Sequence, residues 1–252
     1  TIINCYRKAE VQMKTIIRKG GVIIMALTTT IFMGACSELN KDTSDKVCRA
    51  LNEKYGETFV VTAIGDRLNT DGAKLYVHPA DNKDLLFTAR INRETGVVDD
   101  NYIEEKVNYK VESIVADSFD KRNISVNSRC MVVTQEPLIV ENEDYTPVGF
   151  KEKYNFDHYT LYLVIRQGDF TAADLLAAFE NANNSVGVEL VMICYIFEPE
   201  NYSACVEEMK IYAGMGTTMI EKHSPVSAFN VIAENGVCSV TESELAEKTG
   251  RS

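Results

Sequence analysis

Residues that could do chemistry are few in this sequence, and their spacing matches no familiar metal or catalytic motif. The three histidines, His78, His158 and His223, include no pair at the i, i+4 spacing that lets a helix present two imidazoles to one metal. Two acidic clusters, residues 99–101 and 141–144, carry oxygen ligands of the kind that calcium prefers, but neither has the spacing of an EF-hand loop. We therefore expect surface histidines, solvated acidic loops, no metal and no cofactor.

Cysteine thiols are the other reactive groups. Cys130 and Cys194 fall in apolar, strand-like runs, which is typical of buried thiols. No C-x-x-C pair occurs, so neither a zinc ribbon nor a local redox pair is predicted. An oxidising compartment would allow one or two disulfides, and the disulfide state stays open for the cysteines of the chain body: Cys48, Cys130, Cys194, Cys205 and Cys238.

A thiol-dependent or metal-assisted hydrolase is one alternative for the function. Cys130 could meet His158 in space, because such partners need not be neighbours in sequence. A reactive thiolate needs an electropositive surrounding, however, and locally Arg129 alone supplies a positive charge. The sequence also contains no G-x-S-x-G elbow, no Walker-type phosphate loop and no complete G-x-G-x-x-G. It therefore favours a role that is not enzymatic.

The N-terminal part of the chain has the layout of an export signal. Basic residues at Lys14, Arg18 and Lys19 precede an apolar run over residues 22–33. This run is shorter than the roughly 20 apolar residues that a membrane-spanning helix needs. We expect residues 13–35 to be a signal peptide and residues 1–12 to be an upstream extension of the reading frame.

The end of this segment reads Met33-Gly34-Ala35-Cys36 and resembles the lipobox of bacterial lipoproteins, with Met33 where that family usually has leucine. The resemblance implies cleavage before Cys36, with Met33, Gly34 and Ala35 recognised by the signal peptidase, and a lipid on the Cys36 thiol. It places the protein at the extracytoplasmic face of a bacterial cell membrane, with residues 36–43 as a tether. A secreted protein without lipid and a core cysteine in a helix are the alternatives.

Composition limits the partners of the chain body. The 252 residues are 45% hydrophobic, which is enough to build a core in one or two domains. Lys and Arg number 26 against 37 Asp and Glu, so the net charge of -11 disfavours nucleic acid as a partner. We expect the body to touch the membrane only through the lipid on Cys36.

Hydrophobic periodicity predicts an α+β fold. In a first subdomain, residues 44–135, an antiparallel meander of strands over 58–64, 73–77 and 85–91 is expected to pack on helices. One helix begins at Ser44, a second covers residues 103–115, and a strand over 124–134 follows. Residues 136–158 change in composition and are interpreted as a linker or an excursion.

The second subdomain, residues 159–241, has an α/β-like pattern. Strands over 159–166 and 188–197 flank a helix whose start at Thr171 resembles a capping box, which predicts a parallel crossover unit. Pro199 is expected in the first turn of another helix, closed by Gly214, and Asn235-Gly236 predicts a hairpin. Residues 242–252 form the tail.

Part of the first subdomain resembles a known module. Residues 47–99 carry Lys54-Tyr55-Gly56 in the predicted helix and end in a turn at Thr95-Gly96 followed by Val97, which is similar to a PepSY-type domain. Asn92 stands where that family usually has aspartate. The resemblance implies a regulatory or inhibitory binding module rather than an enzyme.

Aromatic residues gather near the predicted linker, and tyrosine is enriched in binding surfaces. Tyr145, Tyr154, Phe156 and Tyr159 are our candidates for a partner surface, with burial in the core as the alternative. The sequence thus predicts a lipid-anchored extracytoplasmic binding or regulatory lipoprotein with a protein or peptide partner in the envelope. An extracytoplasmic solute receptor and the hydrolase are the other candidates.

Overall fold

A computed structural model of the chain describes residues 41–65, 72–92, 94–134, 138–168, 170–210 and 217–250. The chain divides into two compact units, Thr1–Arg49 and Ala50–Ser252. In the first unit, the described residues 41–49 are helical, and in the second unit residues 50–55 are helical. Since the helix is already formed at residue 41, the expected tether overlaps it by three residues.

The export signal lies outside the described residues. This applies to residues 13–35, to the lipobox residues Met33, Gly34 and Ala35, and to Cys36 itself. Among the described residues, no helix combines the length and the apolar character needed to cross a bilayer.

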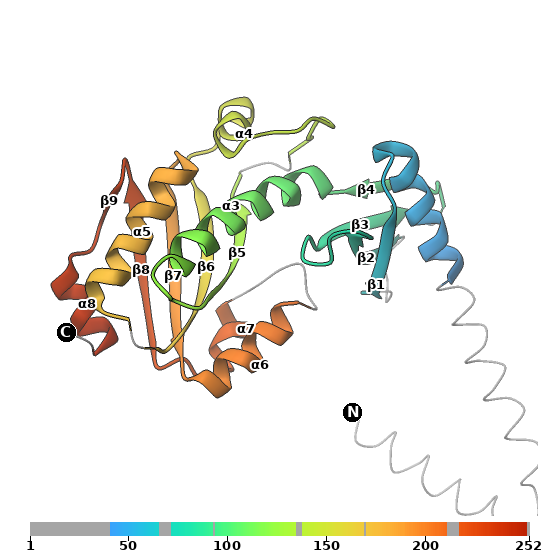
Figure 1. The fold of residues 1–252 in the computed structure, drawn as a ribbon. Helices are drawn as coiled ribbons and strands as arrows, with labels where there is room; N and C mark the ends of the chain where they lie inside the picture. Colours follow the sequence, from blue (N-terminus) through green and yellow to red (C-terminus); the bar gives the residue numbers. More distant parts are fainter. Residues whose placement is uncertain are drawn as a thin grey trace, which may run out of the picture. The chain divides into compact units, whose positions relative to one another are not determined.

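The fold is α+β and contains two separate sheets (Figure 1). The first sheet has the order β1-β2-β3-β4, and every neighbouring pair is antiparallel. This arrangement confirms the predicted meander and adds one short strand to it. The strands are β1 (Phe59–Ile64), β2 (Gly72–Pro79), β3 (Phe87–Asn92) and β4 (Val98–Asp100).

Aromatic rings fill the core beside the first sheet. The ring centroids of Phe59 and Phe87 are 5.6 Å apart, and those of Phe59 and Tyr102 are 5.1 Å apart, both in edge-to-face geometry. Such contacts add stability beyond the burial of apolar area. Tyr102 begins helix α3 (Tyr102–Asp120), so the packing fixes the start of that helix against the sheet.

The second sheet has the order β5-β6-β7-β8-β9 (Figure 1). β6 and β7 are parallel, whereas the other neighbouring pairs are antiparallel. The parallel pair confirms the predicted crossover, and helix α5 (Ala172–Val186) makes the connection. The strands are β5 (Val126–Val132), β6 (Tyr159–Arg166), β7 (Leu190–Phe197), β8 (Ser227–Glu234) and β9 (Val237–Cys238).

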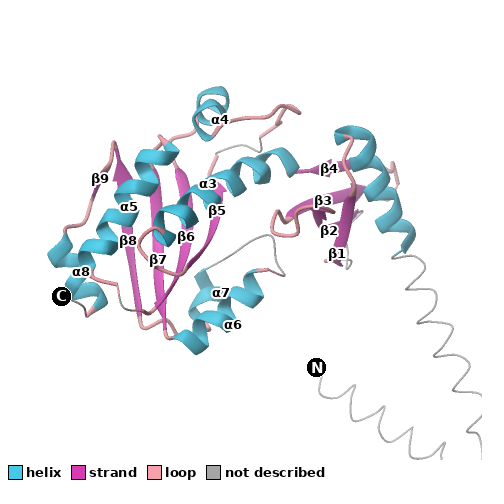
Figure 2. Cartoon of the chain, in the orientation of Figure 1, coloured by secondary structure: helices cyan, strands magenta, loops and turns pink. Residues whose placement is uncertain are grey.

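Helices cover both faces of the second sheet (Figure 2). Helices α3 and α5 pack together on one face, where the rings of Phe119 and Phe179 lie 5.4 Å apart. Residues from β6 and β7 form another buried cluster with α6 (Pro199–Met209) and α7 (Thr217–Glu221). Helix α8 (Glu242–Thr249) closes the described chain.

The change from one sheet to the other does not fall where the composition changes. β5 lies within residues 44–135, yet it pairs with β6 and belongs to the second sheet. Residues 136–158, expected as a linker, contain helix α4 (Pro147–Tyr154), which Thr146 caps and Pro147 begins. The predicted subdomain limits therefore separate two strands that are hydrogen-bonded to each other.

Candidate functional site

The aromatic residues proposed as a partner surface are mostly core residues. Tyr145, Phe156 and Tyr159 are 8%, 5% and 0% exposed, and Tyr154 is half-buried. Their rings pack on one another and on Phe150 of α4. The burial of three of the four rings counts against a partner surface here, because α4, which was not predicted, brings Phe150 against Tyr145, Tyr154 and Phe156.

Two of the histidines and one of the acidic clusters make contacts within the fold. His78 is 7% exposed on β2, and its Nδ1 lies 2.6 Å from the carbonyl oxygen of Pro79, so it is not the surface residue we expected. Nε2 of His223 lies 2.7 Å from the Glu208 carboxylate. Asp100 accepts hydrogen bonds from the Tyr55 hydroxyl and the Lys54 ammonium. Within the described ranges, His, Cys, Asp and Glu side chains form no group of three that could hold a metal.

Cys130, the candidate nucleophile, is only 2% exposed on β5. Burial raises the pKa of its thiol well above the ordinary value, and the nearby carboxylates of Glu112, Glu105 and Glu104 raise it further. A thiol held in its protonated form is a poor nucleophile. The surroundings of Cys130 therefore count against the thiol-dependent hydrolase.

Polar side chains form a stripe along the inner side of α3. Glu105, Asn108 and Glu112 recur at helical spacing, so they lie on one side of the helix. Asn108 is 1% exposed, and its amide donates to Glu105 over 3.4 Å. Asn101 donates to the other oxygen of the Glu105 carboxylate over 3.0 Å. This stripe was not predicted, although its spacing is visible in the sequence among the apolar positions of the helix.

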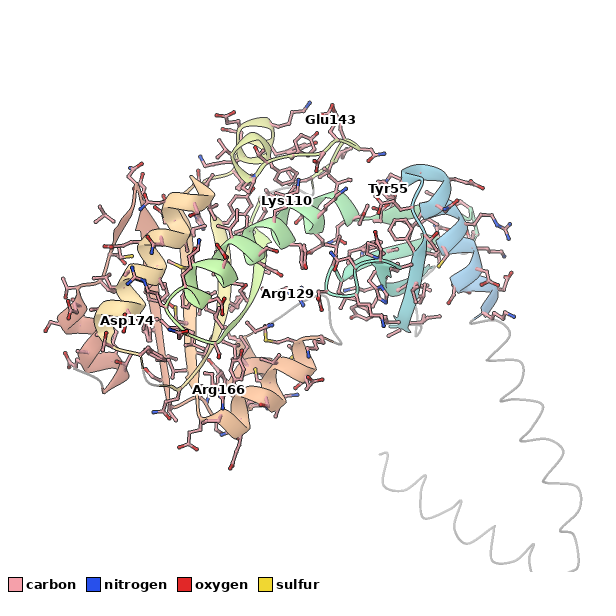
Figure 3. All side chains as sticks on the ribbon, in the orientation of Figure 1. Tyr55, Lys110, Arg129, Glu143, Arg166 and Asp174 are labelled. Carbon is pink, nitrogen blue, oxygen red and sulfur yellow. The ribbon has the colours of Figure 1, made fainter. Side chains whose placement is uncertain are left out.

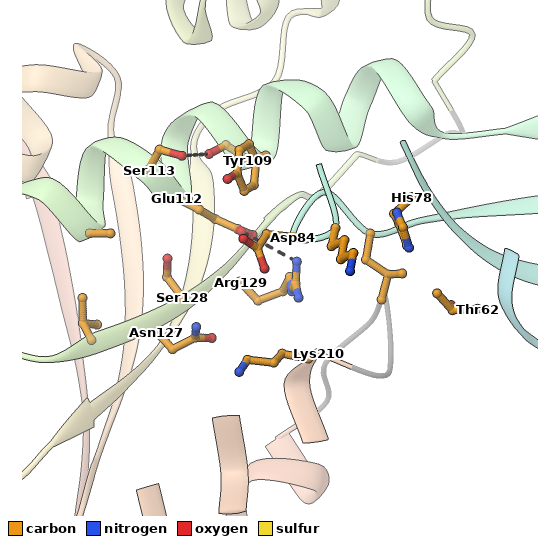
Figure 4. A pocket seen from close by; sticks show the side chains of 14 residues that line it. Thr62, His78, Asp84, Tyr109, Glu112, Ser113, Asn127, Ser128, Arg129 and Lys210 are labelled. Atoms are coloured by element: carbon orange, nitrogen blue, oxygen red, sulfur yellow. Dashed lines mark hydrogen bonds and ion pairs between the residues drawn. The ribbon is translucent and has the colours of Figure 1, made fainter. Parts of the chain in front are cut away.

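Arg129 of β5 (Figure 3) meets Glu112 at the end of this stripe (Figure 4). Arg129 Nη1 lies 3.7 Å from Oε2 of Glu112, and the two side chains are 12% and 11% exposed. Oε1 of Glu112 accepts a hydrogen bond of 2.6 Å from the backbone N–H of Cys130. Arg129 Nη2 donates to the carbonyl oxygen of Met209 over 3.2 Å. One carboxylate thus holds both a strand backbone and the guanidinium beside it.

Burial changes the protonation of this cluster. It raises the pKa of Glu112 to about 7, although Arg129 and the Cys130 N–H act in the opposite direction. Burial also raises the pKa of Glu105 to about 8, and the charges of Glu104 and Glu112 add to this effect. Both carboxyl groups therefore change from the protonated to the charged form near neutral pH.

A cavity of about 590 Å³ opens beside the cluster (Figure 4). Its wall includes Tyr109, Glu112 and Ser113 from α3 and residues 126–129 from β5. Lys83 and Lys210 also contribute to the lining of the cavity. The cavity therefore joins a strand backbone, hydroxyl groups and charges of both signs.

Comparison with known proteins supports the fold alone. The chain is similar to the crystal structure of a DUF5037 family protein from Ruminococcus gnavus, with a TM-score of 0.67 and 13% sequence identity. The match covers 82% of this chain and 99% of that chain. No protein-family model and no curated protein matches the sequence. The resemblances to a lipobox and to a PepSY-type domain stay predictions.

Proposed function

We propose that the chain is a lipid-anchored extracytoplasmic binding protein of the bacterial envelope that holds its ligand in the cavity beside β5. The cavity carries this proposal, because its volume of about 590 Å³ falls within the roughly 300–1,000 Å³ typical of ligand sites. The resemblance of residues 33–36 to a lipobox supports the location.

The charges of the lining favour an anionic ligand. Three cationic side chains, Lys83, Arg129 and Lys210, stand against two acidic ones, Asp84 and Glu112. A protonated Glu112 leaves the Arg129 charge available to a ligand, and burial raises the pKa of Glu112 to about 7. An excess of positive charge in a chain of net charge -11 would select negatively charged groups.

The structure affects the two alternative functions, the solute receptor and the hydrolase, in different ways. The cavity volume also suits a small solute, which keeps the extracytoplasmic solute receptor as a second candidate. The hydrolase loses support, because Cys130 is buried among carboxylates.

Thermal unfolding of the full chain with small anions tests the proposal. The panel contains amino acids, dicarboxylates, sugar phosphates and short acidic peptides. A ligand at about 100 times its Kd stabilises the folded state by about 2.7 kcal/mol, which raises the Tm by roughly 5–10 °C.

Arg129→Gln should abolish this rise in Tm, because the variant removes the buried cation of the cavity wall. Lys121→Gln is the matched control, since Lys121 pairs with Asp117 on the exposed surface of α3. If no member of the panel raises the Tm, or if Arg129→Gln responds like the control, the cavity is not the binding site.

A further inference from the structure

β5 is an edge strand, and the residues that direct their backbone groups towards β6 can be identified. Within the part of the chain that the structure describes, it stands at one end of the second sheet and pairs only with β6. The carbonyl oxygen of Ser125, just before β5, accepts from the N–H of Arg166 over 2.9 Å. Antiparallel hydrogen bonding alternates along a strand, so Asn127 and Arg129 also face β6 with their backbone groups.

The intervening residues therefore direct their backbone groups away from β6. Cys130 shows this directly, because its N–H donates to the Glu112 carboxylate and not to a strand. By the same alternation, the N–H and C=O groups of Val126 and Ser128 point outwards. Both residues line the cavity. The edge of β5 is thus covered by Glu112 at Cys130, whereas its first part borders the cavity.

An open edge beside a cavity is suited to one kind of ligand. An extended peptide adds to a sheet edge through main-chain hydrogen bonds, while neighbouring pockets select its side chains. The side chains of Arg129, Lys83 and Lys210 supply positive charge along the same cavity. A free edge is otherwise a hazard that proteins cover with charges or bulges.

We propose that an extended acidic peptide segment binds as an additional strand to the outer edge of β5, pairing with Val126 and Ser128 and placing a carboxylate near Arg129. This inference rests on the proposed function and names the class of ligand for the same cavity. Pairing through the backbone gives affinity, and the cations give the preference for acidic sequences.

The experiment uses the full chain and a defined pool of heptapeptides. Each peptide carries glutamate at two fixed positions and valine, threonine, isoleucine or tyrosine elsewhere. We expect saturable binding, and we expect amide hydrogen exchange at Val126 and Ser128 to slow at least tenfold. Exchange at Asn127 and Arg129 should stay unchanged, because their N–H groups already face β6.

Two altered pools separate backbone pairing from charge. N-methylation at every residue removes the donors on both edges of the peptide and should weaken binding at least tenfold. Replacing both glutamates with lysine should weaken binding to a similar extent. Equal binding of the N-methylated pool, or slowed exchange without the two-residue alternation, would overturn strand addition.

Protein variants provide a second, independent comparison. Ser128→Pro removes the outward N–H at an edge position where proline is tolerated, and it should abolish binding. Ser128→Ala keeps that N–H and should bind like the wild type. If the peptide pool fails but small anions raise the Tm in a manner dependent on Arg129, strand addition is wrong and the proposed function stands. If both fail, the proposed function falls as well.

Discussion

At the scale of single residues, burial of the carboxyl groups on α3 has a free-energy cost. Glu105 and Glu112 are largely withdrawn from solvent, and a charged carboxylate is poorly stabilised there. Their pKa values of about 8 and about 7 mean that the folded chain binds more protons than the unfolded chain between about pH 4.5 and pH 8. The free energy of unfolding should therefore fall as the pH rises through this range.

Glu105→Gln tests this linkage. Glutamine keeps the shape of the protonated acid and an oxygen for the Asn101 amide, but it cannot ionise. The decrease in free energy of unfolding from about pH 5 to about pH 8.5 should be smaller in the variant, by an amount on the order of 2 kcal/mol. Urea unfolding at the two pH values measures it. Glu53→Gln, at an exposed position, should behave like the wild type, and an equal pH dependence in Glu105→Gln would contradict the argument.

At the scale of elements, sequence patterns predicted the features that depend on contacts between residues close together in the chain. The capping box at Thr171 and the proline that starts α6 are both present, because each depends on residues within one helical turn. β6 has the predicted limits, since both of its faces are buried and the apolar run is continuous. Neither the sheet to which β5 belongs nor the burial of Glu112 could be predicted, because both depend on pairing with distant segments.

The candidate site was missed for the same physical reason. A glutamate on a helix is usually solvated, and only packing against β5 distinguishes Glu112 from the exposed acids of the same helix. The prediction for the tyrosines erred in the opposite direction. Their composition suggested an exposed contact surface, whereas packing with α4 places these rings in a core.

The β8–β9 turn provides a prediction at the same scale. Gly236 has a φ of +77°, and a Cβ atom there would overlap the Asn184 side chain. Gly96 has a similar φ of +73°, but nothing lies within 4 Å of its Cβ position. Gly96→Ala should cost about 1 kcal/mol of unfolding free energy from backbone strain alone. Gly236→Ala should cost about the same, because the atoms that its Cβ would meet belong to the end of the exposed Asn184 side chain, which can turn away. Urea unfolding measures both variants, and a much lower midpoint for Gly236→Ala than for Gly96→Ala would show that the Asn184 side chain cannot move away.

At the scale of the whole molecule, the reactivity of the thiols measures how tightly the core is packed. The chemical state of the N-terminus indicates where the protein is located. Cys130, Cys194 and Cys205 are at most 2% exposed, whereas Cys238 is half-buried. The lipobox resemblance adds that Cys36 should be blocked by its lipid. A single intact-mass measurement on protein from native bacterial membranes can examine both properties.

We expect an acylated chain that begins at Cys36. Iodoacetamide should leave the three buried thiols unlabelled under native conditions and should label them after denaturation, because alkylation requires local opening of the core. An unlipidated chain that retains Met13 would rule out the envelope location. Rapid native labelling of Cys130 would restore the thiol-dependent hydrolase as a candidate.

The hairpin turn also affects the chemical ageing of the chain. At an Asn-Gly pair, the glycine nitrogen can attack the asparagine side-chain carbonyl carbon, which releases ammonia and damages the backbone. Here the N–H of Gly236 donates to Oδ1 of Asn183 over 2.7 Å. Attack on Asn235 requires this nitrogen to lose its proton and to turn towards the side chain, and the hydrogen bond opposes both changes. A buried asparagine on α5 therefore protects a neighbouring asparagine from deamidation for as long as the chain stays folded.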